Sequence, residues 1–362
     1  MAATGSSGRP ALDAMAAAAA GPVAVSRWSR TATVATSTAG LVLVLLVALP
    51  YLAGTGITQA LVTLFVLVSM AALWNLLAGY AGMISFGQQA YLGIGAYVVY
   101  LVAKGGLTPF AGIVAGALAC GLAAVPIFAL LRPLTGGYFA VATWVVAECL
   151  FLYVTNALWL GGGTGVGLQQ LSAMPPVLRQ ADTYWESLAL MAIIVAGVYL
   201  LVRSRFGLDS RATRDEPAAA AAMGVEVGRT RWLAYLLAAA GFGAVGGMLI
   251  VSTLYTDPAS VFSINYSADM LFMVVIGGLG TMEGPIIGAV IFFAVQEEFA
   301  KYGAWYLVAI GAVAIAVVLT APAGLWGLAA RRGWSLLPVG YRVRGGPPPG
   351  PGMGRGGGGP GG

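Results

Sequence analysis

The stretch Trp74–Tyr100, WNLLAGYAGMISFGQQAYLGIGAYVVY, has the apolar character of a membrane segment but carries residues that membrane helices usually avoid. These are the glycines at 79, 82, 87, 93 and 95 and the adjacent glutamines at 88 and 89. Glycine in a helix interior costs about 1 kcal/mol relative to alanine, and a glutamine amide in hydrocarbon needs a hydrogen-bond partner. The stretch therefore predicts a segment that faces other helices or a pathway, and not lipid.

The composition of the whole chain agrees with a membrane location. Of the 362 residues, 59% are hydrophobic and only 9% are charged, whereas soluble proteins average about 25% charged residues. So few charges cannot cover the surface of a water-soluble globule of this size. The chain is therefore predicted to cross the membrane several times.

About ten apolar segments follow one another, each near the ~20 residues that a helix needs to cross a bilayer. They cover residues 38–54, 57–78, 84–103, 107–131, 138–160, 186–202, 232–255, 265–282, 285–300 and 303–321. Glycines and Pro285 in 84–103 and 265–300 allow broken or re-entrant helices there. We predict an all-α polytopic membrane protein with about ten transmembrane helices, some of them broken or re-entrant.

The arginines predict which side of the membrane each loop occupies. Segment 203–231 contains six arginines and the tail from residue 331 contains five, whereas the loop 161–185 contains only Arg179. Because basic residues favour the cytoplasmic side, both termini and 203–231 are expected in the cytoplasm, and 161–185 outside. Residues 1–37 are then a disordered cytoplasmic extension, 38–330 the transmembrane domain, and 331–362 a basic, Pro/Gly-rich cytoplasmic tail.

Several function classes are excluded by missing residue types. The chain has no histidine, which removes histidine proton relays and Ser-His-Asp triads. Its two lysines, Lys104 and Lys301, do not belong to a Walker A motif, so ATP hydrolysis through a P-loop is not expected in this chain. No nucleophile–base pair or metal cluster supports an intramembrane enzyme, and no basic–aromatic stripe predicts nucleic-acid binding. No cofactor is expected in this chain.

A second glycine-rich stretch, VVIGGLGTMEGPIIGAVIFF (274–293), resembles the first. GYAG at 79–82 aligns with GGLG at 277–280, an offset of 198 residues, which suggests an internal repeat, parallel or inverted. Paired interrupted segments in two halves of a chain point to a transport pathway. The candidate pathway residues are Ser85, Phe86, Gly87, Gln88, Gln89, Gly277, Gly278 and Gly280.

Glu148, in the middle of the apolar run WVVAECLFL, is a further pathway candidate. An ionised carboxylate at the centre of a bilayer costs roughly 2.5–3.5 kcal/mol on insertion scales. Two interpretations remain open. Glu148 either belongs to a pathway or gate, or forms an interhelical hydrogen bond without contacting a transported solute.

The arginine-rich segment 204–232, SRFGLDSRATRDEPAAAAAMGVEVGRTRW, contains a short helix signal. Asp215 is predicted as the cap, Pro217 lies in the first turn, the alanines 218–222 propagate the helix, and Gly224 ends it. A helix of about two turns is unstable alone and must dock on something. A separate cytoplasmic ATPase and the phosphates of the membrane surface both fit.

Six blocks of the chain resemble, in order, the permease subunits of branched-chain amino acid ABC importers, specifically the M-type subunit. They are NLLAGYAGMISFGQQAYLGIGAY (75–97), LTGGYFAVATWVVAE (134–148), GGTGVGL (162–168), SRFGLDSRATRDEPAAAAAMGVEVGRTRWLAY (204–235), SADMLFMVVIGGLGTMEGPIIGA (267–289) and PAGLWGL (322–328). The resemblance as a whole covers about residues 38–330.

The resemblance implies a subunit of a heteromeric importer in the bacterial plasma (inner) membrane. It implies pairing with an H-type sister permease, two cytoplasmic ATPase subunits that bind ATP–Mg, and an extracytoplasmic substrate-binding protein. The segment 203–231 would be the coupling loop to the ATPases, through Arg211, Arg214, Asp215, Glu216, Ala220, Met223 and Gly224.

The chain departs from the family pattern in two places. Many members have Gly-His where this chain has Gly87-Gln88, so a titrating histidine is excluded there. Relatives often carry a glutamate within the run that is all alanine at 218–222 here.

The resemblance leaves the transported solute open. Branched-chain amino acids are the family default, but urea, amides and other amino acids are carried by relatives. The rival interpretation is an ATP-independent secondary transporter or channel.

Overall fold

A computed structural model gives the fold of the chain and describes residues 24–26, 30–51, 54–172, 174–299, 303, 305–321, 324–331 and 342–344. Nearly all of its regular structure is helical, as expected for an all-α polytopic membrane protein. The N-terminal half contains α2 (Arg30–Ala48), η1 (Leu49–Tyr51), α3 (Thr55–Asn75), the π-helical turn η2 (Leu76–Tyr80), α4 (Gln89–Lys104), α5 (Pro109–Leu131) and α6 (Gly136–Asn156).

The remaining elements follow an irregular, glycine-rich connection. They are η3 (Leu158–Leu160), η4 (Gly162–Thr164), β2 (Val166–Gly167), α7 (Gln169–Ser172), α8 (Pro176–Arg203), α9 (Arg205–Asp215), α10 (Pro217–Ala222), α11 (Val227–Thr253), β3 (Tyr255–Thr256), α12 (Pro258–Val261), α13 (Asn265–Gly277), α14 (Gly284–Phe299), α15 (Trp305–Thr320) and α16 (Gly324–Arg331). The short strands β1 (Ala24–Ser26) and β4 (Arg342–Arg344) pair antiparallel with each other.

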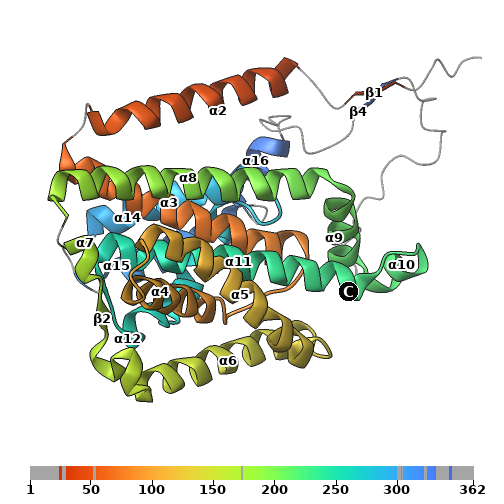
Figure 1. Ribbon diagram of the computed structural model, residues 1–362. Coiled ribbons are helices and arrows are strands. Elements are labelled where there is room, and N and C mark those ends of the chain that lie inside the picture. Colours follow the sequence, from red (N-terminus) through yellow and green to blue (C-terminus); the bar gives the residue numbers. More distant parts are fainter. Residues whose placement is uncertain are drawn as a thin grey trace, which may run out of the picture.

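Helices α3 and α11 form the centre of the bundle (Figure 1). The protein buries 78% of the most apolar window of Thr55–Tyr80 and 72% of that of Val227–Thr253, but only 28% of those of α5, α6 and α8. Helix α11 packs against α4 and α5, α3 packs against α8, and α13 pairs with α14. The outer helices therefore expose apolar side chains to lipid or to a partner.

Small residues allow the central helices to approach closely. A Cβ added at Gly95 of α4 would lie 2.0 Å from the carbonyl oxygen of Gly243 in α11, and one at Gly243 would lie 2.5 Å from the carbonyl oxygen of Gly116 in α5. Three backbones thus meet where no side chain fits, as is typical of helix packing in membranes. At Gly95 the predicted stretch thus faces other helices, as expected from the sequence.

The two ends of the bundle differ in character. Helices α9 and α10 lie together at one end, and β2, α7 and α12 lie at the other (Figure 1). At the second end, β2 pairs antiparallel with β3, which ties the glycine-rich connection after α6 to the end of α11. By the placement of the arginines, the end with α9 and α10 is the one expected in the cytoplasm.

The prediction of about ten transmembrane helices is not confirmed. Among the described residues, six helical stretches are long and apolar enough to cross a membrane: Thr55–Tyr80, Pro109–Leu131, Gly136–Asn156, Pro176–Arg203, Val227–Thr253 and Pro258–Gly277. Helices α4, α14 and α15 have 16 residues each, which is about 24 Å of helix against the ~30 Å of a hydrocarbon core. The expected breaks near 84–103 and 265–300 are present, and they shorten α4, α13 and α14.

The boundaries of the terminal segments also differ from the prediction. Residues 30–37, expected in a disordered extension, belong to α2, and residues 24–26 pair with 342–344 of the predicted tail. The helix begins early because its first turns, RTATVATST, contain no proline or glycine to stop it. The other residues of the predicted extension, 1–23 and 27–29, lie outside the described residues, as does most of the tail.

Candidate functional site

The first break in the bundle follows α3, which ends in the π-helical turn η2 before an irregular segment leads to α4. Ser85 anchors this segment, because its carbonyl oxygen accepts a hydrogen bond from the Trp74 indole (3.0 Å) and its hydroxyl accepts one from Gln88 Nε2 (2.8 Å). Gly87 lies against α6, where an added Cβ would be 2.1 Å from the carbonyl oxygen of Thr143. Ser85, Gly87 and Gln88 are therefore packed against protein.

Gln89 connects the first break to α13. The hydroxyl of Ser267 donates a hydrogen bond to Gln89 Oε1 at 2.5 Å, and both side chains are buried. A neutral amide and a hydroxyl that satisfy each other can be buried at membrane depth at low cost. The sequence predicts a hydrogen-bond partner for each buried glutamine amide. For Gln89 this partner is Ser267, 178 residues further along the chain.

The second break lies between α13 and α14. Gly278 and Gly280 have φ angles of 131° and 76°, which favour glycine. Gly82 of the first break has φ 68° and aligns with Gly280 in the suggested repeat. The two aligned glycines therefore share a left-handed backbone conformation at the end of an interrupted helix.

Asn75 joins the two breaks to each other. Its Nδ2 donates to the carbonyl oxygen of Thr281 (2.8 Å), and its Oδ1 accepts from the backbone N–H of Gly280 (2.8 Å). One buried carboxamide therefore satisfies a donor and an acceptor that the break in the α13–α14 region leaves free. At this junction a Cβ on Gly79 would lie 2.6 Å from the nitrogen of Gly280.

Two arginines of α9 reach this junction from the end of the bundle. Arg214 Nη1 donates to the carbonyl oxygen of Gly79 at 2.5 Å, and the same atom lies 2.6 Å from where a Cβ of Gly280 would be. The Arg211 guanidinium lies over the Tyr80 ring, 5.3 Å from its centroid. Arg214 also pairs with Asp215 at 2.7 Å. Helix α9 thus contacts both breaks at once.

The predicted coupling helix is present, with one correction. Helix α10 begins at Pro217 and its N-cap is Glu216, whereas Asp215 is the last residue of α9. Pro217 fixes the first helical φ, which places the cap one residue before it. Gly224 has φ 88° just after the helix, as its role in ending the helix requires. Ala220 is buried, whereas the Met223 side chain is 74% exposed.

Glu148 lies within α6, in the middle of the apolar run. Its side chain lies on the exposed face of α6, whereas Thr143 and Ala147 lie on the buried face of the same helix. Exposed apolar side chains surround Glu148 on this face, among them Trp144, Val145 and Leu152. Among the described residues it forms no interhelical hydrogen bond, so the hydrogen-bond interpretation finds no partner within this chain, and the pathway interpretation stays a prediction.

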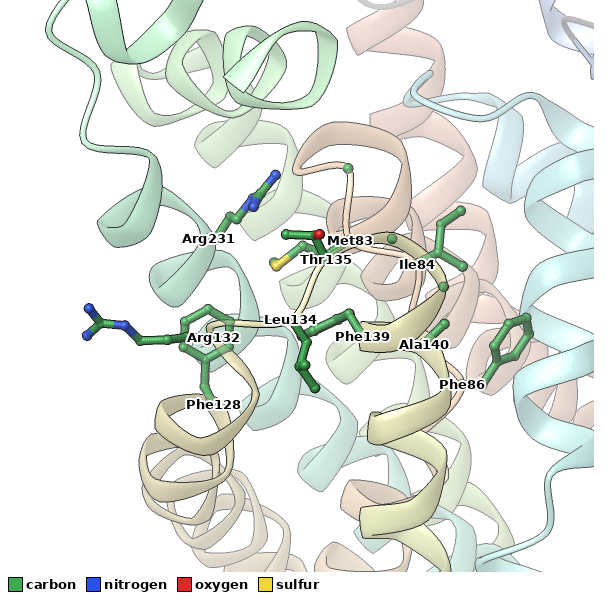
Figure 2. A pocket seen from close by; sticks show the side chains of 13 residues that line it. Met83, Ile84, Phe86, Phe128, Arg132, Leu134, Thr135, Phe139, Ala140 and Arg231 are labelled. Atoms are coloured by element: carbon green, nitrogen blue, oxygen red, sulfur yellow. The ribbon is translucent and has the colours of Figure 1, made fainter. Parts of the chain in front are cut away.

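A cavity of about 300 Å³ lies beside the first break, at the end of the bundle with α9 and α10. It is lined by Gly82, Met83, Ile84, Phe86, Phe128, Arg132, Leu134, Thr135, Gly136, Gly137, Phe139, Ala140 and Arg231 (Figure 2). Of the residues predicted to line the pathway, Phe86 is the one that lines this cavity. Among the described residues, no three acids or cysteines lie close enough to hold a metal ion.

The structure therefore brings most of the predicted residues together, but in a different arrangement. Ser85, Gly87, Gln88 and Gln89 surround one break and Gly277, Gly278 and Gly280 form the other, and the two breaks meet at Asn75. The prediction missed Asn75, Thr143, Ser267 and Thr281 as partners. The first of these was detectable, since an asparagine one turn before a glycine-rich break is costly in hydrocarbon without such partners.

This architecture of interrupted membrane helices agrees with the comparison to known proteins. Residues 56–319 match the family described as branched-chain amino acid transport system / permease component. The chain belongs to this family. It is a permease subunit of the ABC importer class, which removes the rival interpretation of an ATP-independent transporter or channel.

Individual relatives support the same subunit type. The high-affinity branched-chain amino acid transport system permease protein LivM of Escherichia coli is 23% identical over 316 residues, which cover 78% of this chain and 73% of that protein. A probable LivH permease of Methanocaldococcus jannaschii is 28% identical over 148 residues (38% of this chain, 45% of that protein). The autoinducer 2 import permease LsrC of Klebsiella pneumoniae is 33% identical over 157 residues, which cover 39% of this chain and 42% of that protein.

The broad coverage of the LivM relatives, against the partial coverage of the others, confirms the prediction of an M-type subunit. These relatives are transport components. No solved structure matches the chain.

Proposed function

We propose that this permease subunit forms half of the translocation pathway of an importer for branched-chain amino acids. It pairs with an H-type sister permease, and two cytoplasmic ATPase subunits bind ATP–Mg, while this chain binds no cofactor. A binding protein outside the cell delivers the solute. The importer lies in the bacterial plasma (inner) membrane, and both termini of this chain are cytoplasmic.

The substrate class is supported by how far each relative matches. The LivM relatives, named for branched-chain amino acids, cover 78% of this chain. The relatives named for autoinducer 2 and guanosine cover 39% and 23%. The family match over residues 56–319 includes both interrupted regions. Since the family and the relatives with the broadest coverage are both named for branched-chain amino acids, these are the best-supported cargo.

The contact of Arg214 with the junction of the two breaks supports the coupling role most directly. An ATPase docked on α10, through the exposed Met223, would move α9, since only Glu216 separates the two helices. Arg214 would pass that movement to Gly79 and Gly280, where the backbones of two membrane segments already meet. Rigid helices that rock about interrupted segments are a known means of alternating access.

The position of Glu148 supports the pairing with a sister permease. In lipid, an ionised carboxylate at the bilayer centre costs roughly 2.5–3.5 kcal/mol. Intramembrane carboxylates usually face the interior of a bundle or a water-filled cavity. The exposed face of α6 with Glu148 is therefore assigned to the interface with the sister permease, on the pathway between the two subunits.

The test replaces Arg214 in the assembled importer. Arg214→Ala removes a charge-assisted hydrogen bond, and such bonds contribute about 1.5–3 kcal/mol, so uptake is expected to fall by at least about tenfold. ATPase subunits should still co-purify, because α10 is untouched. Arg214→Lys keeps the charge but loses the planar fork, and should restore uptake only in part.

The matched control is Arg229→Ala in the same loop. Arg229 is 72% exposed and its only ion pair among the described residues is with Glu226 at 3.7 Å. This variant should transport at the normal rate. Normal uptake in Arg214→Ala, or the same loss in both variants, would contradict the proposed link.

A further inference from the structure

The cavity beside the first break has an unusual combination of apolar walls and unpaired positive charge. Its walls come from the end of α5, the start of α6, the start of α11 and residues 82–86. Most lining side chains are apolar, and two arginines, Arg132 and Arg231, are the charged ones. No acidic residue lines the cavity.

Neither arginine has a carboxylate partner in the part of the chain that the structure describes. Arg231 Nε is buried and makes no hydrogen bond, although buried donors are normally satisfied. Figure 2 places both arginines on the same side of the cavity, opposite Ile84 and Phe86. The guanidinium of Arg132 points outward from this rim.

The start of α6 adds further free donors on the same cavity. The side chain of its N-cap, Thr135, accepts no hydrogen bond from the first turn of the helix, so the first N–H groups keep their capacity for an external acceptor. An added Cβ at Gly136 or Gly137 would meet nothing within 4 Å, so a ligand can approach this backbone. Helix N-termini of this kind favour anions.

These features together identify the chemistry of the ligand. Two guanidinium groups and free backbone N–H groups favour an anion, and the aromatic and aliphatic walls favour an apolar body beside it. A free amino acid fits poorly, because no carboxylate is present for its ammonium group. Leu130 lies on α5 between the lining residues Phe128 and Arg132 and is 70% exposed, and Leu118 and Leu122 are also exposed along that helix.

We propose that this cavity binds an anionic phospholipid, with the phosphate headgroup at the rim that carries Arg132 and Arg231 and the acyl chains passing the apolar walls to the exposed face of α5. The proposal rests on the assignment of this end of the bundle to the cytoplasmic leaflet, where basic pockets recognise such lipids. Because the lipid would contact Met83, Ile84 and Phe86, its binding stabilises one arrangement of the first break.

The experiment uses the assembled importer in nanodiscs of phosphatidylcholine with or without phosphatidylglycerol. Native mass spectrometry counts the phosphatidylglycerol molecules that remain bound after transfer to detergent. The double variant Arg132→Gln/Arg231→Gln is expected to bind the tightly held lipid about 30-fold more weakly, since each basic residue contributes about a fivefold factor. Arg205→Gln/Arg229→Gln, with the same change of charge, is the control and should retain it.

Each outcome has a defined meaning. Equal lipid retention by the double variant and the wild type overturns the proposal. Displacement of the lipid by inorganic phosphate assigns the site to a soluble anion and also overturns it. If the double variant does not assemble, Arg132→Gln alone decides, because this side chain is exposed at the end of α5 and its loss should weaken retention about fivefold.

Discussion

Asn75 is the residue on which the junction of the two breaks depends. Its carboxamide bonds two adjacent residues within the second break, the N–H of Gly280 and the carbonyl oxygen of Thr281, at 2.8 Å in each case. A side chain with only a donor or only an acceptor cannot make both bonds. The hydrogen bonds described between the α3 segment and the α13–α14 break therefore both come from one side chain, at the end of the helix that precedes the π-helical turn.

We expect Asn75→Leu, which keeps the branching at Cγ but removes both polar atoms, to lower both stability and uptake. It leaves the Gly280 N–H and the Thr281 carbonyl without partners, at about 1–3 kcal/mol for each buried group. The melting temperature of the purified importer and its uptake measure the two effects. Asn156→Leu is the control, since within the described part of the chain the side chain of that exposed asparagine bonds only to Leu152 of its own helix. An equal effect of both changes would count against the junction.

Gly280 supports a second prediction at the same junction. A methyl group there meets an unfavourable φ of 76° and lies 2.6 Å from Arg214 Nη1. Gly280→Ala is expected to cost about 1–3 kcal/mol and to reduce uptake more than ATPase binding, because it displaces Arg214 from Gly79. Gly311→Ala in α15, where a Cβ meets nothing within 4 Å, should be neutral or slightly stabilising.

At this scale the sequence located the polar and glycine residues of the site but not their neighbours. An apolar run with Gln88 and Gln89 requires partners, yet residue spacing cannot tell a water-filled pathway from a buried hydroxyl. The structure gives Gln89 the hydroxyl of Ser267 and gives Gln88 the hydroxyl of Ser85. Glu148 is the opposite case, because no partner for it lies within the described part of this chain. Helical periodicity alone does not reveal which face of α6 a second subunit covers.

At the scale of elements, the short helix α10 was predictable because its signals are local. Pro217 and Gly224 fix the two ends by backbone conformation alone. Helix α9 was not predicted. Its sequence is polar, and its place against η2 depends on contacts between Arg211 and Tyr80 and between Arg214 and Gly79, which are far apart in the chain.

The structure sharpens the test of α10 as a docking element. Ala220 is buried, so a carboxylate there would disturb the folding of the loop itself. Met223→Asp instead changes an exposed side chain, and it should uncouple ATP hydrolysis from uptake or release the ATPase, with an uptake loss of about tenfold for an apolar contact of this size. Co-purification and uptake are the measurements.

Val177→Asp is the matched control for Met223→Asp. Val177 has the same exposure of 74% but lies at the start of α8, at the opposite end of the bundle. It should leave ATPase binding unchanged. Normal uptake and normal ATPase retention in Met223→Asp would remove α10 from the coupling path.

For the whole molecule, composition was enough to place the chain in a membrane but not to count its crossings. Segments 84–103, 285–300 and 303–321 satisfied a window of apolar residues, yet each contains a helix of only 16 residues. Glycine breaks consume part of the apolar length, and apolarity does not reveal where a helix stops. The number of helices that cross completely therefore depends on packing.

The same two exposed positions, at opposite ends of the bundle, also test the orientation of the whole protein. In a Cys149→Ser background, with Cys120 buried, Val177→Cys should react with a membrane-impermeant maleimide in intact cells. Met223→Cys should react only after permeabilisation, because six arginines in 203–231 hold that end in the cytoplasm. The reverse pattern would put α9 and α10 outside, where no ATP-driven subunit could move Arg214 against the two breaks.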